Sequence, residues 1–458
     1  MHAPWNTELR SLLGLALPVI TVQVGVMLMG FVDAMMLGHD TEEALAAAAL
    51  GNLYSMLMML FGFGVLISLD PVMSQAVGAR DDGAITRNLQ RGLILCVALM
   101  IPTAFACLAA GPMLTALGQR PELIPHATNY VWILIPSILP FYCFQVLRTT
   151  LQAYHRTAAI VWTILIANLA NVFCNWVLIF GHLGFDPMGV EGSAIGTTLC
   201  RWLMFLLLFC MGRKQFLGHL TPWSATAFEL KPLRRLLRVG SPVGVQMLLE
   251  FGAFGTMLLF MGWISVSALA GHMAAINLAS MTYVVTLGLS VATSVRVGHG
   301  VGRGDLSGAR WSAVMGLGVA VVIMAGFAAL FLVAPEPLAA LFSDDSDIGA
   351  REVALTLLPI AAVFQVMDGV QVVALGALRG IADTRAPLLI NLLGFWGLGV
   401  PCGYYFAFGL EGGPEGLWWG LTVGLAAVAV FLTARVWVKL RGDLVRTVID
   451  DSDVTRPA

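Results

Sequence analysis

The sequence predicts an all-α integral membrane protein in which twelve transmembrane helices form two pseudo-symmetric six-helix lobes. Three observations predict this architecture: an apolar composition, twelve long apolar segments, and an internal repeat. Of the 458 residues, 58% are hydrophobic and only 11% are charged, whereas about 25% of the residues of a soluble protein are charged. Such a chain cannot cover itself with a water-compatible surface, so most of its solvent is lipid. The net charge of −2 gives no basic field that would attract nucleic acid.

Twelve segments of the chain meet the requirement of about 20 mostly apolar residues for a helix that crosses a bilayer. These segments are residues 11–37, 44–69, 92–112, 129–150, 158–180, 191–212, 239–261, 266–292, 311–334, 351–379, 386–409 and 416–438. Nearly all lysines and arginines lie between them on one side, and the loops of the other side carry only Arg120 and Arg351. Because basic residues favour the cytoplasmic side, both termini are predicted to be cytoplasmic.

An internal repeat relates the two halves of the chain. A shift of 224 positions superposes Pro18 on Pro242 and Gly38 on Gly262, and it superposes VGARD at 77–81 on VGRGD at 301–305. We therefore predict an N-terminal six-helix lobe at 1–212, a cytoplasmic linker at 213–238, a C-terminal six-helix lobe at 239–440 and a polar cytoplasmic tail at 441–458. Parallel repeats of this kind are typical of transporters whose substrate site lies between the repeats.

Two carboxylates share one depth in the predicted membrane. Glu250 lies 11 residues after Val239 and Asp368 lies 11 residues before Arg379, so each is about 17 Å from the inner end of its helix at ~1.5 Å per residue. Ionisable groups at this depth usually mark function. Two such acids cannot both stay charged and unpaired. They either share a proton or hold a cation such as Na⁺ through hard oxygen ligands, and the alternative is a buried acid with a purely structural role.

Glutamines accompany both acids at helical spacing. Gln365 and Gln371 lie three residues before and after Asp368, and Gln246 lies four residues before Glu250. Residues at these spacings share a helix face. These polar stripes are predicted to face protein or water as part of an ion or proton network.

Apolar side chains continue the same helix faces. Phe254 and Met257 follow Glu250 by four and seven residues, and Phe364 precedes Asp368 by four. Methionine adapts to varied ligands, and aromatic rings attract organic cations. We therefore treat these three residues as candidates for a substrate cleft, while most methionine and phenylalanine in a membrane bundle packs or faces lipid.

The first half has its own polar residues inside predicted helices. Asp33 lies in the outer part of the first helix or at its interface, where a solvated acid is the alternative to a functional one. Asn168, Asn171 and Asn175 recur three and four residues apart, so their amides bind an ion or join helices. Arg201 lies about ten residues into the sixth helix, where it either pairs with an acid of this half or snorkels along its helix.

Several motifs of this chain resemble those of one transporter family over roughly residues 9–441. They are Pro18 with MGFVD at 29–33, PVMSQ at 71–75, LEF at 249–251, SVRVGH at 294–299 and FQVMDGVQVVALGALRG at 364–380. On these motifs the chain resembles the multidrug and toxic compound extrusion (MATE) transporters, in particular the bacterial NorM-type branch.

The resemblance implies secondary active efflux of varied, mainly cationic organic compounds in exchange for Na⁺ or H⁺ by alternating access, in the bacterial plasma membrane. It implies a coupling site at Glu250 and Asp368, and a second one at Asp33 beside Asn171 and Asn175. Phe364 departs from the family pattern, because a close relative offers a tyrosine there, and this puts the identity of the ion in doubt. We expect a monomer that needs no cofactor apart from its coupling ion.

Two other function classes fit the sequence less well. A flippase for a lipid-linked precursor would line its cleft with basic residues for pyrophosphate, whereas the central charges here are mostly acidic. An intramembrane enzyme is disfavoured because the sequence contains neither HExxH nor G-x-S-x-G. The sequence therefore predicts a transporter and no enzyme.

Overall fold

The computed structural model describes residues 5–39, 41–341, 348–442, 444–447 and 449. Within these residues all regular structure is helical, and twelve helices, some with internal breaks, are long and apolar enough to cross a membrane. The predicted all-α architecture with twelve spans is therefore confirmed. Most of the predicted tail at 441–458 lies outside the described residues.

The chain divides into two compact units. The first-half unit comprises Thr21–Gly244, and the second-half unit joins the residues up to Ile20 to Val245–Thr447. Each unit is described by itself below.

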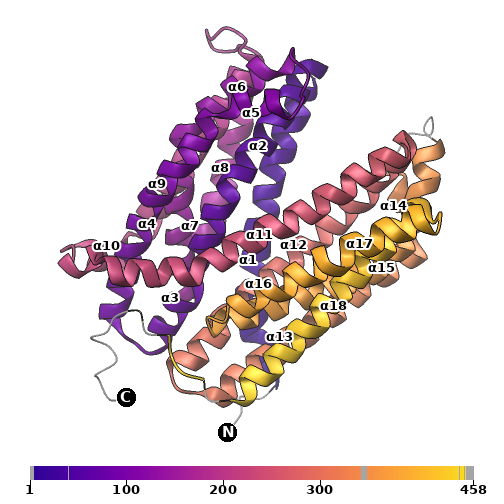
Figure 1. Ribbon diagram of the computed structural model, residues 1–458. Helices are drawn as coiled ribbons and strands as arrows, with labels where there is room; N and C mark the ends of the chain where they lie inside the picture. The colour runs from indigo at the N-terminus through magenta and orange to yellow at the C-terminus, as the bar shows by residue number, and fades with distance from the viewer. Residues whose placement is uncertain (1–4, 40, 342–347, 443, 448, 450–458) are drawn as a thin grey trace. The chain divides into compact units, whose positions relative to one another are not determined.

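The first-half unit is a bundle in which α2, α4, α7 and α9 pack on one another and α8 packs on α9 (Figure 1). Its elements are α1 (Trp5–Gly38, from Thr21 onward), α2 (Glu42–Ile67), α3 (Leu69–Gly78), α4 (Asp82–Leu108), α5 (Ala110–Ala116), α6 (Leu123–Leu134), η1 (Ile135–Ser137), α7 (Ile138–Ala153), α8 (Ala158–Leu178), α9 (Gly189–Met211), α10 (Arg213–Leu220) and η2 (Ala225–Phe228). The predicted span 129–150 contains a short 3-10 turn, η1, because Pro136 lacks the backbone N–H that a regular helix requires.

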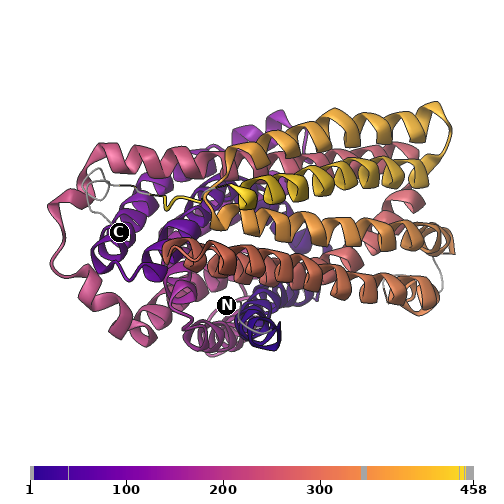
Figure 2. The same ribbon diagram turned by 90° about the horizontal axis from the view of Figure 1, so that it is seen from below.

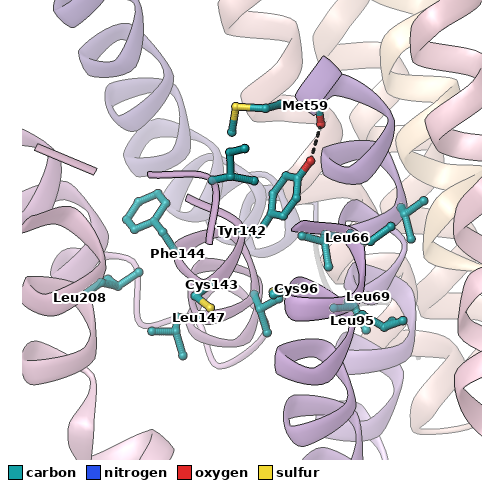
Figure 3. Packing of buried hydrophobic residues seen from close by; sticks show 14 of the residues in the cluster. Met59, Leu66, Leu69, Leu95, Cys96, Tyr142, Cys143, Phe144, Leu147 and Leu208 are labelled. Atoms are coloured by element: carbon teal, nitrogen blue, oxygen red, sulfur yellow. Dashed lines mark hydrogen bonds between the residues drawn. The ribbon is translucent and has the colours of Figure 1, made fainter. Parts of the chain in front are cut away.

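Tyr142 of α7 contacts both α2 and α4 at the centre of this unit (Figure 3). Its phenol donates a hydrogen bond to the carbonyl oxygen of Met59 at 3.1 Å and lies 3.2 Å from the hydroxyl of Thr103. A Cβ atom at Gly62 would collide with the same phenol oxygen, so glycine is required there for α2 and α7 to approach. This packing satisfies a buried polar group without water.

The second-half unit is a bundle of long helices that lie side by side (Figure 2). Its elements are α11 (Leu230–Ile264, from Val245 onward), α12 (Val266–Gly302), α13 (Leu306–Val333), α14 (Pro335–Ala339), α15 (Ile348–Gly380), α16 (Arg385–Asn391), η3 (Leu392–Gly399), α17 (Val400–Tyr404), η4 (Tyr405–Gly409) and α18 (Gly413–Arg441). Together η3 and η4 make the predicted span 386–409 largely π-helical. Pro401 lies between them in α17, and because proline has no backbone N–H it interrupts the regular α-helical hydrogen bonds.

Close packing of α12 against α15 depends on small residues. A Cβ atom at Gly376 would collide with the carbonyl oxygen of Ser290, and one at Gly380 would lie 2.7 Å from that of Ser294. The two backbones therefore approach as closely as glycine permits, which is a common device in membrane bundles. This contact fixes the register of α15, the helix that carries Asp368.

The helices α1 and α11 each begin in one unit and continue in the other. Leu12 and Leu15 of α1 pack with the second-half core, whereas Val22 packs with the first-half core. Leu236 of α11 packs with the first-half core, and Met257 packs with the second-half core. The units therefore differ from the predicted lobes at the start of each repeat, because the first turns of each helix bury their apolar face on the other half's core.

The internal repeat extends to the ends of the helices. Thr41 caps α2 by accepting from the N–H of Ala44 at 3.1 Å, and Ser265, 224 positions later, caps α12 in the same way at 3.0 Å. Asp81 and Asp305 form an equivalent pair of caps on α4 and α13. Each cap satisfies a backbone N–H that the first helical turn leaves without a partner. The hydrogen bond from the Gly308 N–H also lowers the pKa of Asp305.

The predicted linker is folded onto the start of α4. The Gln90 side chain donates to the carbonyl oxygen of His219 at 2.9 Å and accepts from the Ser224 N–H at 3.0 Å. Arg91, fully buried, donates to the carbonyl oxygen of Thr226 at 2.8 Å. Most of the segment at 213–238 is helical, as α10, η2 and the first turns of α11, and is held by side chains of the first-half unit.

Candidate functional site

Glu250 and Asp368 form an acidic pair inside the second-half unit. Glu250 lies on α11 and is half-buried, and Asp368 lies on α15 and is 6% exposed. The two carboxylates lie close enough to interact electrostatically. Among the described residues, Asp368 accepts no hydrogen bond and makes no ion pair, although it is buried. A buried carboxylate in this situation requires a proton or a cation.

The predicted glutamines lie around this pair. Gln371 donates to Oε1 of Glu250 at 3.3 Å, and its own Oε1 is buried without a donor in the described part of the chain. Gln365 accepts from the Thr282 hydroxyl at 2.9 Å, and Gln246 is buried one turn before Glu250. The glutamine stripes therefore face protein, and Gln371 offers an oxygen that could bind a cation.

The aromatic candidates Phe254 and Phe364 each lie one helical turn from one of the two acids. Phe254 packs edge-on against Phe364, with ring centroids 6.2 Å apart, and Phe364 packs against Trp418 at 5.5 Å. Phe364 and Met257 are 3% and 1% exposed, whereas Phe254 keeps part of its surface exposed. Phe254 is thus the one of the three whose ring is partly accessible.

Asp33 lies at the centre of a second polar cluster, inside the first-half unit. Its Oδ1 accepts from the side-chain amides of Asn171 at 2.9 Å and Asn175 at 2.5 Å, and its Oδ2 accepts from Thr197 at 3.3 Å. Asp33 is therefore bound by α8 and α9 rather than solvated at an interface. The Oδ1 atoms of both asparagines are buried, and no described residue donates to them.

The third asparagine of the stripe has a different partner. Asn168 donates to the carbonyl oxygen of Gly25 at 3.0 Å and so joins α8 to α1. Asn168 therefore joins helices, which is one of the two roles considered for the asparagine stripe. Asn171 and Asn175 surround an acid, and their binding of an ion stays a prediction.

Arg201 lies in the same unit without a carboxylate partner. Its Nη1 donates to the hydroxyl of Ser137 at 2.9 Å and lies 3.6 Å from the sulfur of Met59, and its Cζ lies 5.2 Å from the ring centroid of Phe141. No acid of the described chain comes within ion-pair distance of Arg201, and it does not snorkel to a helix end. It interacts with Asp33 only over a longer electrostatic distance.

Comparison with known proteins places this geometry in a family. The MatE family model matches the chain twice, at residues 18–177 and 242–405. The two matches begin 224 positions apart, which confirms the internal repeat. The chain is 35% identical over 446 residues to the probable multidrug resistance protein NorM of Mesorhizobium japonicum, covering 95% of this chain and 94% of that protein. The chain belongs to the MATE family.

Further relatives and solved structures agree with this assignment. The multidrug resistance protein NorM of Photobacterium profundum is 32% identical over 448 residues, covering 96% of this chain and 97% of that protein. The crystal structure of the eukaryotic MATE transporter AtDTX14 matches with a TM-score of 0.85 at 22% identity, covering 95% of this chain and 97% of that one. An outward-facing multidrug resistance MATE family transporter matches with a TM-score of 0.85 at 19% identity, covering 96% and 99%. The fold is thus that of MATE transporters, which are not enzymes.

In this MATE family member, α12 and the end of α15 add site residues that the sequence analysis missed. The Tyr283 side chain lies within electrostatic range of both Glu250 and Asp368, and Arg379 lies within electrostatic range of Glu250. The Tyr283 phenol thus lies near the acids, although Phe364 replaces the tyrosine expected there. No pattern in the sequence identified either residue, because Tyr283 lies one residue outside the hydroxyl stripe that Thr282, Thr286, Ser290 and Thr293 form on α12.

Proposed function

We propose that this chain is a secondary active exporter of varied, mainly cationic organic compounds, driven by the inward movement of Na⁺ or H⁺ through alternating access. Its family membership supports transport, and relatives at 35% and 32% identity are named multidrug resistance proteins. The pair formed by Glu250 and Asp368 carries the proposal of cation coupling. Asp368 is buried and accepts no hydrogen bond from the described residues, and a carboxylate in that situation is stable only when it binds a proton or a cation.

The coupling step follows from charge balance at this pair. When a cation or proton occupies the site, at least one negative charge is neutralised, and when it leaves, the uncompensated charge attracts an organic cation. Substrate and coupling ion then compete for the same carboxylates. Phe254 supports an organic cation as the substrate, because its partly exposed ring, one helical turn after Glu250, offers cation–π contact.

Asp33 is proposed as a second coupling site. Its carboxylate and the Oδ1 atoms of Asn171 and Asn175 together offer hard oxygen ligands. Binding of a cation there requires both amides to turn their oxygens toward it. Protonation of Asp33 would instead break one or more of its three hydrogen bonds.

Transport by the purified protein in proteoliposomes tests the proposal. A Na⁺ gradient and a pH gradient are imposed separately, and export of a fluorescent organic cation is followed. Glu250→Gln and Asp368→Asn are each expected to reduce gradient-driven export at least about tenfold, since a loss of 1.4 kcal/mol of coupling free energy is a factor of ten. Glu336→Gln, an exposed acid on α14, is the matched control. Unchanged export by both site variants would refute cation coupling at this pair.

We also propose that the chain is a monomer of the bacterial plasma membrane with both termini in the cytoplasm. The distribution of basic residues supports this orientation. Single cysteines placed beside Arg120 and beside Arg303 should react with a membrane-impermeant thiol reagent from the outside and from the inside, respectively. The reverse pattern of labelling would contradict the orientation.

A further inference from the structure

His272 and Trp418 form a buried hydrogen-bonded pair in the second-half unit. His272 lies near the start of α12 and Trp418 near the start of α18, and the two residues are 3% and 1% exposed. The Nε1–H of Trp418 donates to Nδ1 of His272 at 3.1 Å, and the ring centroids lie 5.8 Å apart. An indole N–H can only donate, and a buried donor requires an acceptor. This hydrogen bond therefore determines how the indole of Trp418 lies.

The direction of this hydrogen bond also determines the form of the histidine. Because Nδ1 of His272 accepts, the proton of the neutral ring lies on Nε2. A protonated ring would carry an N–H group at both nitrogens, and two donors would then face each other at Trp418. His272 therefore acts here as a neutral acceptor, in contrast to the acids Glu250 and Asp368, which are candidates for binding an ion.

The backbone next to His272 is held in place by close packing. A Cβ atom at Gly271 would lie 2.7 Å from the side chain of Val353 and 2.9 Å from the carbonyl oxygen of Ala350, both on α15. The helices α12 and α15 therefore approach each other here as closely as glycine permits, as they do at Gly376. The acceptor is thus carried by a rigid part of the unit, which is what a group that positions another side chain requires.

A series of ring contacts leads from Trp418 to the candidate substrate surface. Trp418 packs edge-on against Phe364 with ring centroids 5.5 Å apart, and Phe364 packs edge-on against Phe254 at 6.2 Å. Phe364 lies one turn before Asp368, and Phe254 lies one turn after Glu250. Of the three rings, Phe254 alone keeps part of its surface exposed. The histidine of α12 thus acts on the accessible ring of α11 through one ring of α18 and one of α15.

We propose that His272 is a positioning residue for substrate recognition, because its hydrogen bond to Trp418 holds the ring of Phe254 in one orientation. The proposal rests on the proposed export function and adds to it a residue that does not itself touch the substrate. A planar aromatic cation stacks well only on a ring whose face is held still. A tetraalkylammonium ion has no flat face, so it makes cation–π contact with a mobile ring nearly as well.

Two monovalent cations test this role in proteoliposomes: ethidium, which is planar and aromatic, and tetraethylammonium, which has no aromatic body. His272→Leu should raise the KM of ethidium roughly 3- to 10-fold relative to that of tetraethylammonium, with little change in maximal rate, because an aromatic contact is weakened. His272→Asn, whose amide oxygen falls where Nδ1 lies, should restore most of the lost discrimination. Trp418→Phe should reproduce the ratio of His272→Leu, and combining the two should add little. His126→Leu, at an exposed histidine of α6, is the control and should change neither KM.

Three results would overturn this role. Equal loss of both cations in His272→Leu would show that His272 only supports the fold, and unchanged KM values would show no role in recognition. If His272→Asn is no better than His272→Leu, the hydrogen bond is not the cause. If His272→Leu does not fold, His272→Gln decides by the same ratio, because its amide lies at the position of Nε2 and not of Nδ1. Binding of ethidium without a gradient, followed by its fluorescence and by its displacement with tetraethylammonium, separates this test from that of export, because a fixed ring discriminates between the cations even if no gradient drives transport.

Discussion

Replacement of Glu8 by leucine should destabilise the second-half unit by about 3 kcal/mol, near the lower end of the range for a buried ion pair that loses one partner. Glu8 lies in the first turn of α1, and its side chain is 5% exposed. It accepts two hydrogen bonds from Arg296 of α12, at 2.7 and 2.5 Å, and one from Ser312 of α13 at 2.7 Å. Arg296 is 19% exposed, so water compensates part of its charge and the lower end of the range applies.

A double-mutant cycle measures this interaction directly. Glu8→Leu, Arg296→Met and the double variant are unfolded in mixed micelles by titration with sodium dodecyl sulfate, and tryptophan fluorescence reports the free energy of unfolding. The double variant should recover to within about 1 kcal/mol of the wild type, because apolar side chains replace a buried pair at little net cost. Glu352→Gln, an exposed acid on α15, is the control. A double variant no more stable than Glu8→Leu alone would refute the reasoning.

Three further predictions concern the linker and the α12–α15 contact. Burial lowers the pKa of His219 below its ordinary value of 6.5, and the charge of Asp82 partly opposes this shift. The linker is therefore docked above pH 6.5 and loosens as the pH falls below it. Hydrogen exchange of the linker, corrected for intrinsic rates, should show this loosening, and protection that does not depend on pH would contradict it. Gln90→Leu should weaken linker docking by about 1–3 kcal/mol, because the His219 carbonyl oxygen and the Ser224 N–H both lose their hydrogen-bond partner. The expected readout is faster hydrogen exchange confined to the linker. Gly376→Ala should destabilise the protein by about 1–3 kcal/mol through overpacking, as measured by the same detergent titration. Gly318→Ala is the control and should be nearly neutral, because a Cβ atom at Gly318 meets open space. Equal effects of the two substitutions would exclude backbone contact as the cause.

The sequence predicted the features that depend on local composition. Hydropathy located the twelve spans, and the repeated register of 77–81 and 301–305 proved to contain a pair of equivalent helix caps, Asp81 and Asp305. These features follow from residues close in the chain. The exchange of α1 and α11 between the units was not predictable, because it depends on which distant core buries Leu12 and Leu236, and helical periodicity gives no information on partners.

The candidate site was predictable to a similar extent. Equal depth in the membrane predicts that Glu250 and Asp368 lie near each other, because depth follows from counting residues along straight helices. The contribution of Tyr283 could not be derived in this way. Its proximity to the acids depends on the rotation and register of α12 against α15, which the contact at Gly376 determines.

The two acidic sites differ in what an incoming cation must change. Asp33 already accepts three hydrogen bonds, so a cation there must first displace donors and turn the amides of Asn171 and Asn175. Asp368 accepts none from the described residues, so a cation or proton binds there without breaking an existing interaction. The cost of losing hydrogen bonds to a charged group, about 1.5–3 kcal/mol each, therefore falls on Asp33 alone. If both sites load during a cycle, the pair that contains Asp368 should fill at the lower ion concentration, and Asp33 should respond only after it.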